Sequence, residues 1–451
     1  MNEQTPQPPD ILSEGDVNIS PRCKAWLAEH VGAETARLLE RDARVFFHQA
    51  LSTPCVNALA ACEGAEIMDT QGRRFLDFHG NSVHQVGFRN PAVIEAVKAQ
   101  LDTLPFCPRR YTNAPAVSLA EKLAALAPGG PNKVLLAPGG TTAVGMALKL
   151  ARAATGRFKT VSMWDSFHGA SLDAISVGGE TIFRRGAGPL LPGAEHVPPP
   201  EPYRCVWGCR DNCTLRCADY VEYVLEKEGD VAAVIAETVR STAVVPPPDG
   251  YWKKIRDACD RHGALLILDE TAVCLGRTGA MFAAERYRVR PDILICGKGL
   301  GGGVFPLAAV IASAELDVCG QGAIGHYTHE KSPVGAAAAL ATIEFIEAED
   351  LINKAEQMGR HALGRLAALK DKHPVIGDVR GVGLLLGVEL VEDRGSRRPA
   401  RDAAEAVMYA ALARGLSFKV SQGNILTLVP PLTVTREQMD RAIDILDDCL
   451  P

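Results

Sequence analysis

Lys298 is the residue of this sequence whose surroundings most favour chemistry. It stands between Gly297 and Gly299, directly after the apolar run 292–297. A lysine held at the end of a buried strand among glycines has poor access to bulk water, so its pKa can fall. It would then supply a free amine for imine formation and proton transfer. A solvated surface lysine is the ordinary alternative.

Asp269 occupies a comparable position, directly after the apolar run 264–268. An aspartate there could simply cap a helix. It could also pair with the ring nitrogen of a bound heteroaromatic cofactor and keep that nitrogen protonated, which makes the ring an electron sink.

Two further segments follow apolar runs and have the residue types of a ligand site. Pro138-Gly139-Gly140-Thr141-Thr142 has glycines and hydroxyls at a helix start, which suits an anion such as a phosphate. A plain strand-to-helix turn with a threonine cap is equally compatible. Ser166-Phe167-His168-Gly169 offers an aromatic ring that could stack on a flat ligand or belong to the core.

Alternating strands and helices must position these segments. We expect strands at 134–138, 159–163, 231–236, 264–269, 292–297 and 307–312, and helices at 141–154 and 250–262. Short apolar runs separated by helices indicate a mostly parallel sheet covered on both faces. Ligands of such sheets bind at the carboxyl ends of the strands, where all four segments fall.

The chain is different before and after this region. A hairpin is expected over 64–78 and a helix over 91–104. After Pro333, apolar residues spaced three or four apart over 351–369 predict a helix. Strands at 376–391, a helix at 400–414, a strand at 424–429 and a helix from Thr435 follow, and Thr435 with Gln438 fits a capping box. This part predicts a second, smaller α+β domain.

Composition narrows the choice of partner and location. The 451 residues have a net charge of −6, which offers no general attraction to nucleic acid or to an anionic membrane. The polar start of the chain, residues 1–21, does not resemble a secretory signal. The apolar stretch 334–346 is too short to span a membrane. We therefore expect a cytoplasmic protein with neither nucleic acid nor membrane as a partner.

Taken together, the motifs resemble those of the class III aminotransferases of pyridoxal-phosphate (PLP) fold type I. The resemblance covers about residues 65–450 and includes the 29-residue spacing from Asp269 to Lys298 and the segment GDVRGVGLLLGVEL at 377–390. It implies an α/β fold with a mostly parallel seven-stranded sheet in a large domain plus a smaller α+β domain. Residues 66–330 would form the large PLP-binding domain and 331–451 the small domain, to which residues 1–65 contribute.

The resemblance also implies roles for individual residues. Lys298 would hold PLP as a Schiff base and act with Asp269, which pairs with the ring nitrogen. The other residues expected at the cofactor are Gly140 and Thr141 at its phosphate, Phe167 stacked on its ring, and His168 and Glu237 beside it. Thr328 matches a threonine that reaches the phosphate of a neighbouring subunit, which implies a homodimer or a dimer of dimers.

Three positions depart from the family pattern. Thr427 stands where members that use 2-oxoglutarate carry an arginine for the substrate carboxylate. A dicarboxylic acceptor would lose a charge-assisted pair there, typically about 1.5–3 kcal/mol. Ala272 replaces a usual glutamine, and Thr142 replaces a frequent acidic residue. These changes weaken the interpretation as an ordinary transaminase.

More narrowly, the segments 106–113, 164–169 and 326–333 resemble the (R)-1-hydroxy-2-aminoethylphosphonate ammonia-lyase branch of the family. This implies loss of water and release of ammonia from a small β-hydroxy amine, giving phosphonoacetaldehyde. A class III (omega) aminotransferase and an amino-acid racemase are the alternatives. A phosphonate needs cations, and the candidates are Arg109, Arg110, Arg240 and Lys331, with Lys331 and one of Arg109 and Arg110 favoured. Each of these side chains could instead form a structural ion pair or be solvated at the surface without binding substrate.

A cysteine-rich insert at 203–219 holds Cys205, Cys209, Cys213 and Cys217, four residues apart throughout. Four thiolates close in sequence could bind a structural zinc ion. The spacing is not one of the common zinc patterns, and free or buried thiols are the alternative.

Overall fold

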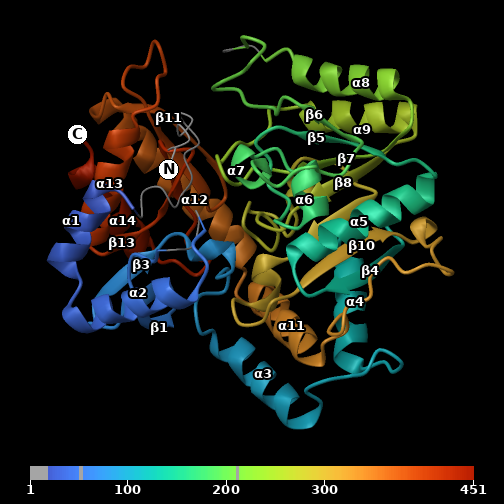
Figure 1. Cartoon of the computed structure of the whole chain (residues 1–451), viewed down its shortest axis with the longest axis horizontal. Helices are drawn as coiled ribbons and strands as arrows, with labels where there is room; N and C mark the ends of the chain where they lie inside the picture. The colour runs from blue at the N-terminus through green and yellow to red at the C-terminus, as the bar shows by residue number, and fades with distance from the viewer. Residues whose placement is uncertain (1–18, 50–53, 210–212) are drawn as a thin grey trace, which may run out of the picture.

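The computed structural model describes residues 19–49, 54–209 and 213–451. Figure 1 shows two parts, a large one built on a central sheet and a smaller one that contains both the first described helices and the end of the chain. Residues 1–18 and 50–53 of the expected N-terminal segment and residues 210–212 of the cysteine-rich insert lie outside the described residues.

The central sheet confirms the predicted seven-stranded, mostly parallel arrangement. Its order is β4-β10-β9-β8-β7-β5-β6. Neighbouring strands from β9 to β6 pair in parallel, whereas β10 runs antiparallel to β9 and β4. The strands are β4 (Asn132–Ala137), β5 (Lys159–Met163), β6 (Ala194–Val197), β7 (Val231–Glu237), β8 (Leu265–Asp269), β9 (Ile293–Cys296) and β10 (Ala308–Ser313).

Helices cover both faces of this sheet, as expected for parallel strands whose residues are apolar on both sides. In Figure 1 the strands β5–β8 pass between α8 and α9 on one side and α5 and α6 on the other. The helices of the large part are α3 (Pro91–Thr103), α4 (Ala114–Leu126), α5 (Gly140–Thr155), α6 (Leu172–Val177), α7 (Thr181–Arg184), α8 (Arg216–Glu228), α9 (Tyr251–His262), α10 (Ala283–Arg286) and α11 (Pro333–Ala348).

The smaller part contains two four-stranded sheets, β1-β2-β3-β13 and β11-β12-β15-β14. Their strands are β1 (Leu59–Glu63), β2 (Glu66–Asp69), β3 (Arg74–Asp77), β11 (Ile376–Val382), β12 (Leu385–Leu390), β13 (Leu416–Ser417), β14 (Lys419–Ser421) and β15 (Ile425–Leu428). The helices are α1 (Pro21–His30), α2 (Ala33–Val45), α12 (Leu351–Lys372), α13 (Arg401–Ala413) and α14 (Arg436–Cys449).

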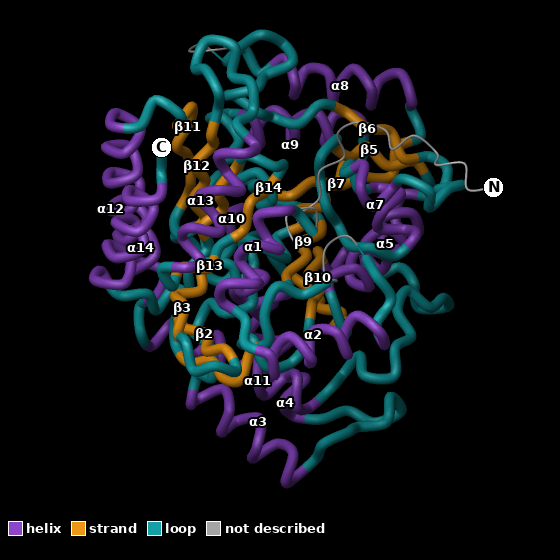
Figure 2. Tube along the Cα trace, turned by 60° about the vertical axis from the view of Figure 1, so that its left-hand side comes forward, coloured by secondary structure: helices purple, strands orange, loops and turns teal. Residues whose placement is uncertain are grey.

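The N-terminal helix α1 packs on α13, because Cys23 and Trp26 form a buried cluster with Tyr409. Figure 2 shows α12 and α14 side by side on the outside of the small part. There Arg365 of α12 binds Asp440 and Asp444 of α14.

Capping signals account for where several helices begin. Thr435 and Gln438 form the predicted capping box of α14. Asn90 caps α3 and Ser332 caps α11, and in each case a proline occupies the first turn. The apolar stretch 334–346 forms most of α11, which is buried on nearly every side because it packs between α3 and α4. Within the described residues, no helix is both long and apolar enough to cross a membrane.

Candidate active site

A cavity of about 470 Å³ lies at the carboxyl ends of the parallel strands. The loops that follow β4, β5, β7, β8 and β9 all contribute to its lining, because parallel strands bring these ends to one edge of the sheet. Phe305, Pro306 and Leu307 complete this edge, since they precede the antiparallel strand β10. The volume suits a cofactor together with a small substrate.

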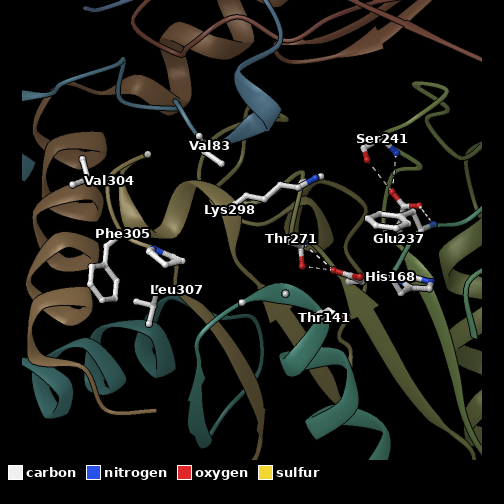
Figure 3. Close-up of a pocket in the computed structure, with 18 residues that line it drawn as sticks. Val83, Thr141, His168, Glu237, Ser241, Thr271, Lys298, Val304, Phe305 and Leu307 are labelled. Atoms are coloured by element: carbon white, nitrogen blue, oxygen red, sulfur yellow. Dashed lines mark hydrogen bonds and ion pairs between the residues drawn. The ribbon is translucent and has the colours of Figure 1, made fainter. Parts of the chain in front are cut away.

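Lys298 extends into this cavity from the end of β9, between Val83 and Thr271 in Figure 3. Its backbone adopts a φ of 45°, a strained value for a residue other than glycine and one that concentrates at functional sites. Burial lowers the pKa of Lys298, and the charge of Lys419 lowers it further, although Glu237 and Asp269 oppose this. The fraction of neutral, nucleophilic amine therefore rises.

Asp269 is the buried acid of the site. Its Oδ2 lies 2.8 Å from His168 Nδ1, and its Oδ1 accepts hydrogen bonds from the Thr271 backbone N–H and hydroxyl at 3.0 and 2.6 Å. Burial would raise the pKa of Asp269, but these bonds and the charge of His168 hold it below the ordinary value. Burial would likewise lower the pKa of His168, which Asp269 raises instead. The cavity thus contains a stable carboxylate.

Gly140 and Thr141 form the N-terminus of α5 at the floor of the cavity. Gly139 at the N-cap of this 16-residue helix has no side chain to cap it, so the first-turn N–H groups suit an anion. The Thr141 hydroxyl lies 2.7 Å from the Ser171 hydroxyl. A Cβ on Gly169, whose φ is 121°, would lie 2.4 Å from Thr141 Oγ1, which is why the loop after β5 needs a glycine here.

Glu237 lies at the end of β7 and is held from two sides. Its Oε1 accepts the Phe167 N–H at 3.2 Å, and its Oε2 accepts the Ser241 N–H and hydroxyl at 2.9 and 3.0 Å. Figure 3 shows these bonds. Phe167 itself lines the cavity and packs on Phe183, with ring centroids 4.4 Å apart.

Ser241 and Thr271 also line the cavity, and they are not among the site residues predicted from the sequence. Ser241 follows Glu237 by four residues, and Thr271 follows Asp269 by two. In each case the hydroxyl donates a hydrogen bond to that strand-end carboxylate. A hydroxyl shortly after a strand-end carboxylate was the available signal.

The predicted substrate cations do not line the cavity. Arg109, Arg110 and Lys331 are exposed on two neighbouring loops, together with Thr328. These loops touch through the rings of Phe106 and His329, whose centroids are 5.2 Å apart, and through a hydrogen bond from Asn113 Nδ2 to the Lys331 carbonyl.

Arg240 is buried away from the cavity and ion-paired. Its Nη2 lies 2.7 Å from Glu201 and its Nη1 lies 3.9 Å from Asp165. This is the structural pairing that the sequence left open as its alternative. Lys298 is the only Lys or Arg among the described residues that line the cavity.

The structure does not support the expected zinc ion in the cysteine-rich insert. Within residues 19–49, 54–209 and 213–451, no three or more metal-ligating side chains are grouped to hold a metal. Cys217 is buried on α8 in the hydrophobic core, where burial raises its pKa to about 11, whereas Cys213 is exposed. Cys205 and Cys213 both contact Cys209, but the described part of the insert does not gather these thiols into a metal site.

Comparison with known proteins identifies the family. The sequence profile described as aminotransferase class-III matches residues 49–450. The chain belongs to the class III aminotransferase family. It is 49% identical to the (R)-1-hydroxy-2-aminoethylphosphonate ammonia-lyase of Vibrio splendidus (strain 12B01), over 97% of this chain and 95% of that protein. It is 37% identical to a leucine/methionine racemase of Thermococcus litoralis, over 91% and 94% of the two chains.

Solved structures of transaminases share the fold. An (S)-enantioselective omega-transaminase from Thermomicrobium roseum superposes with a TM-score of 0.87 at 30% identity, covering 92% of this chain and 99% of the other. A PLP-bound amine transaminase from an uncultivated Pseudomonas species superposes with a TM-score of 0.84 at 32% identity, covering 90% and 98%.

The cavity of this class III chain fits PLP. A buried carboxylate, a lysine of lowered pKa and an uncapped helix N-terminus face one space, and an aromatic ring lines it. These groups correspond in chemistry to the ring nitrogen, the aldehyde, the phosphate and the flat ring of the cofactor. Thr427 stands where family members that use 2-oxoglutarate carry an arginine. Its hydroxyl lies 3.0 Å from Ser421 Oγ and 3.5 Å from the Thr242 carbonyl oxygen, so this position supplies hydrogen bonds but no positive charge.

Proposed function

We propose that the protein is a PLP-dependent ammonia-lyase. Its substrate is a small β-hydroxy amine, (R)-1-hydroxy-2-aminoethylphosphonate or a close analogue, and its products are phosphonoacetaldehyde and ammonia. The similarity to the Vibrio splendidus ammonia-lyase over 97% of this chain carries the proposal. The neutral Thr427 agrees with it, because a lyase needs no keto-acid acceptor.

The residues around the cavity divide the work of holding the cofactor. Lys298 would bind its aldehyde, and Asp269, braced by His168 and Thr271, would keep its ring nitrogen protonated. Phe167 would lie against the ring, and Gly140 and Thr141 would hold the phosphate. Glu237 would stand beside the ring, fixed by Ser241. PLP, when bound, supplies an electron sink that stabilises negative charge on the carbon bearing the substrate nitrogen.

Lys298 would also move the proton of the reaction. Once the substrate amine has displaced it, its neutral Nζ can take a proton from the carbon bearing nitrogen. The electron pair left on that carbon forms a carbon–carbon double bond as the neighbouring hydroxyl leaves, with one proton, as water. The released enamine takes up water and yields one aldehyde and one ammonia. The net change is substrate to aldehyde plus ammonia, with one water lost and one consumed.

The protein would act as a homodimer or a dimer of dimers. Thr328 is exposed and outside the cavity of its own chain, which agrees with a role at the cofactor phosphate of a neighbouring subunit. Light scattering measures the oligomer. Thr328→Ala is expected to weaken cofactor binding without dissociating the dimer.

A racemase is the second candidate, because the racemase of Thermococcus litoralis is 37% identical to this chain. It would use the same proton abstraction and return the proton to the other face.

One product analysis separates the three activities. The holoenzyme is incubated with (R)-1-hydroxy-2-aminoethylphosphonate, with and without pyruvate, and ammonia, aldehyde and alanine are measured. The proposal expects ammonia and aldehyde in equal amounts, independent of pyruvate. Alanine formation that requires pyruvate would identify a transaminase. In a parallel incubation with L-leucine or L-methionine, inversion of configuration without ammonia release would identify a racemase.

A further inference from the structure

The proposed substrate has a phosphonate, but the described lining of the cavity provides no cation besides Lys298. Lys298 is committed to the cofactor and the proton. A doubly charged anion held without a cation or aligned donors is costly in a partly buried site. A further cation or a set of aligned donors at the rim of the cavity is therefore needed.

Lys419 lies where such a group is needed. It belongs to β14, which pairs antiparallel with β15, and its direct partner in that register is Thr427. Directly opposed residues of antiparallel strands project from the same face, with Cβ atoms about 4.5–5.5 Å apart. The positive charge therefore stands one strand away from the position where related transaminases carry arginine.

The surroundings of Thr427 connect this face with the cavity. The Thr427 hydroxyl lies 3.5 Å from the carbonyl of Thr242, and the adjacent Ser241 lines the cavity and holds Glu237. On the same strand, Ser421 Oγ lies 3.0 Å from Thr427 Oγ1, which adds two hydroxyls beside Lys419. The sheet face with Lys419, Ser421 and Thr427 thus borders the loop that closes the cavity.

The electrostatics agree with this placement. Besides the burial that dominates, the charge of Lys419 lowers the pKa of Lys298, so the two amines are close enough to interact. Arg380, also on this sheet face, is held by Asp378 and Glu389 and by the carbonyls of Ala243 and Val244, and it fixes this edge of the sheet against the loop that contains Thr242. Lys419 is only partly buried, which lets its flexible stem reach an anion.

We propose that Lys419, assisted by the Ser421 and Thr427 hydroxyls, binds the phosphonate of the substrate and replaces the arginine that the family places at position 427. This proposal rests on the proposed function for the identity of the anion. It assigns the anion site to the same subunit as the cavity. The exposed Arg109, Arg110 and Lys331 become the alternative.

Two measurements on the holoenzyme test the proposal. Calorimetry gives the affinity for ethylphosphonate, which has no amine and cannot react, and steady-state kinetics give KM and kcat for the hydroxyaminophosphonate. The variants are Lys419→Met, which keeps the stem, Lys419→Arg, which keeps the charge, and Lys331→Met as the matched loss of an exposed candidate.

Loss of one charge-assisted pair predicts that Lys419→Met binds ethylphosphonate about 10- to 100-fold more weakly and raises KM by a similar factor, with a smaller change in kcat. Lys419→Arg should retain binding within about threefold, and Lys331→Met should match the wild type. Equal affinity of Lys419→Met and wild type, weak binding confined to Lys331→Met, or no binding by the wild type would each overturn the proposal. Ethylphosphonate binding that depends on Lys419 in a protein without lyase turnover would support the anion site and reject the proposed reaction.

Discussion

Replacing His168 with leucine tests how the site keeps Asp269 ionised. The two side chains are buried and 2.8 Å apart. A hydrogen bond to a charged group contributes about 1.5–3 kcal/mol, and one pKa unit corresponds to about 1.36 kcal/mol. Losing this bond should therefore raise the pKa of Asp269.

The sign of the effect on cofactor binding follows directly. Asp269 binds the protonated ring nitrogen only as a carboxylate, so the affinity is present above its pKa and is lost as the pH falls through it. A raised pKa moves the acid limb of the affinity profile to higher pH.

The assay is the dissociation constant for PLP, followed by tryptophan fluorescence from the lowest pH at which the protein stays folded up to pH 9. His168→Gln is the matched control, because its amide can still donate to Asp269, and we expect its profile between those of the wild type and His168→Leu. If the profiles of His168→Leu and wild type coincide, then His168 does not set the ionisation of Asp269 and the reasoning is wrong.

Three further predictions concern other parts of the molecule. In α12, Gly359→Ala places a Cβ 2.1 Å from the Gly383 carbonyl oxygen, whereas the Cβ of Gly364→Ala meets nothing within 4 Å. Chemical denaturation should show that Gly359→Ala lowers the unfolding free energy by about 1–3 kcal/mol. Gly364→Ala should raise it by about 1 kcal/mol. Ser241→Ala removes the hydrogen bond from the Ser241 hydroxyl to Glu237 but keeps the bond from the backbone N–H. The kcat/KM should therefore fall roughly 3- to 10-fold and recover in Ser241→Thr. An unchanged kcat/KM would exclude Ser241 from positioning Glu237. Burial raises the pKa of Asp77 to about 6 from 3.8, so its contribution to stability is fully present below pH 3.8 and is lost as the pH rises through 6. The unfolding free energy of Asp77→Asn should therefore increase relative to that of the wild type between pH 4 and pH 7. A difference that stays constant over this range would refute the prediction.

The sequence predicted the parts of the fold that depend on local patterns. Apolar runs at strand length placed the strands from β4 to β10, with the exception of β6, within one or two residues. The elements it did not identify lack such a signal. β1 is largely exposed, β13 has two residues, and α8 begins within the cysteine-rich insert. Their positions depend on contacts distant in sequence, such as the parallel pairing of β13 with β3.

The candidate site divides in the same way. Parallel strands end at one edge, so sequence alone could bring Lys298, Asp269 and the Gly140 loop together. The sequence could not predict the hydrogen bond between His168 and Asp269, which are 101 residues apart, or the ion pair between Arg240 and Glu201. The pairing of Lys419 with Thr427 was also beyond it, because strand register depends on the turn between β14 and β15 and on which face is buried.

The most direct test of the central claim is a ³¹P NMR time course of (R)-1-hydroxy-2-aminoethylphosphonate with the holoenzyme and no keto acid, compared with Lys298→Ala. If the protein is an ammonia-lyase, we expect complete conversion to phosphonoacetaldehyde over many turnovers and one ammonia for each aldehyde. Lys298→Ala should show no conversion. Conversion that stops at one equivalent of enzyme and resumes when pyruvate is added would contradict it, because the amino group would then remain on the enzyme until an acceptor removes it.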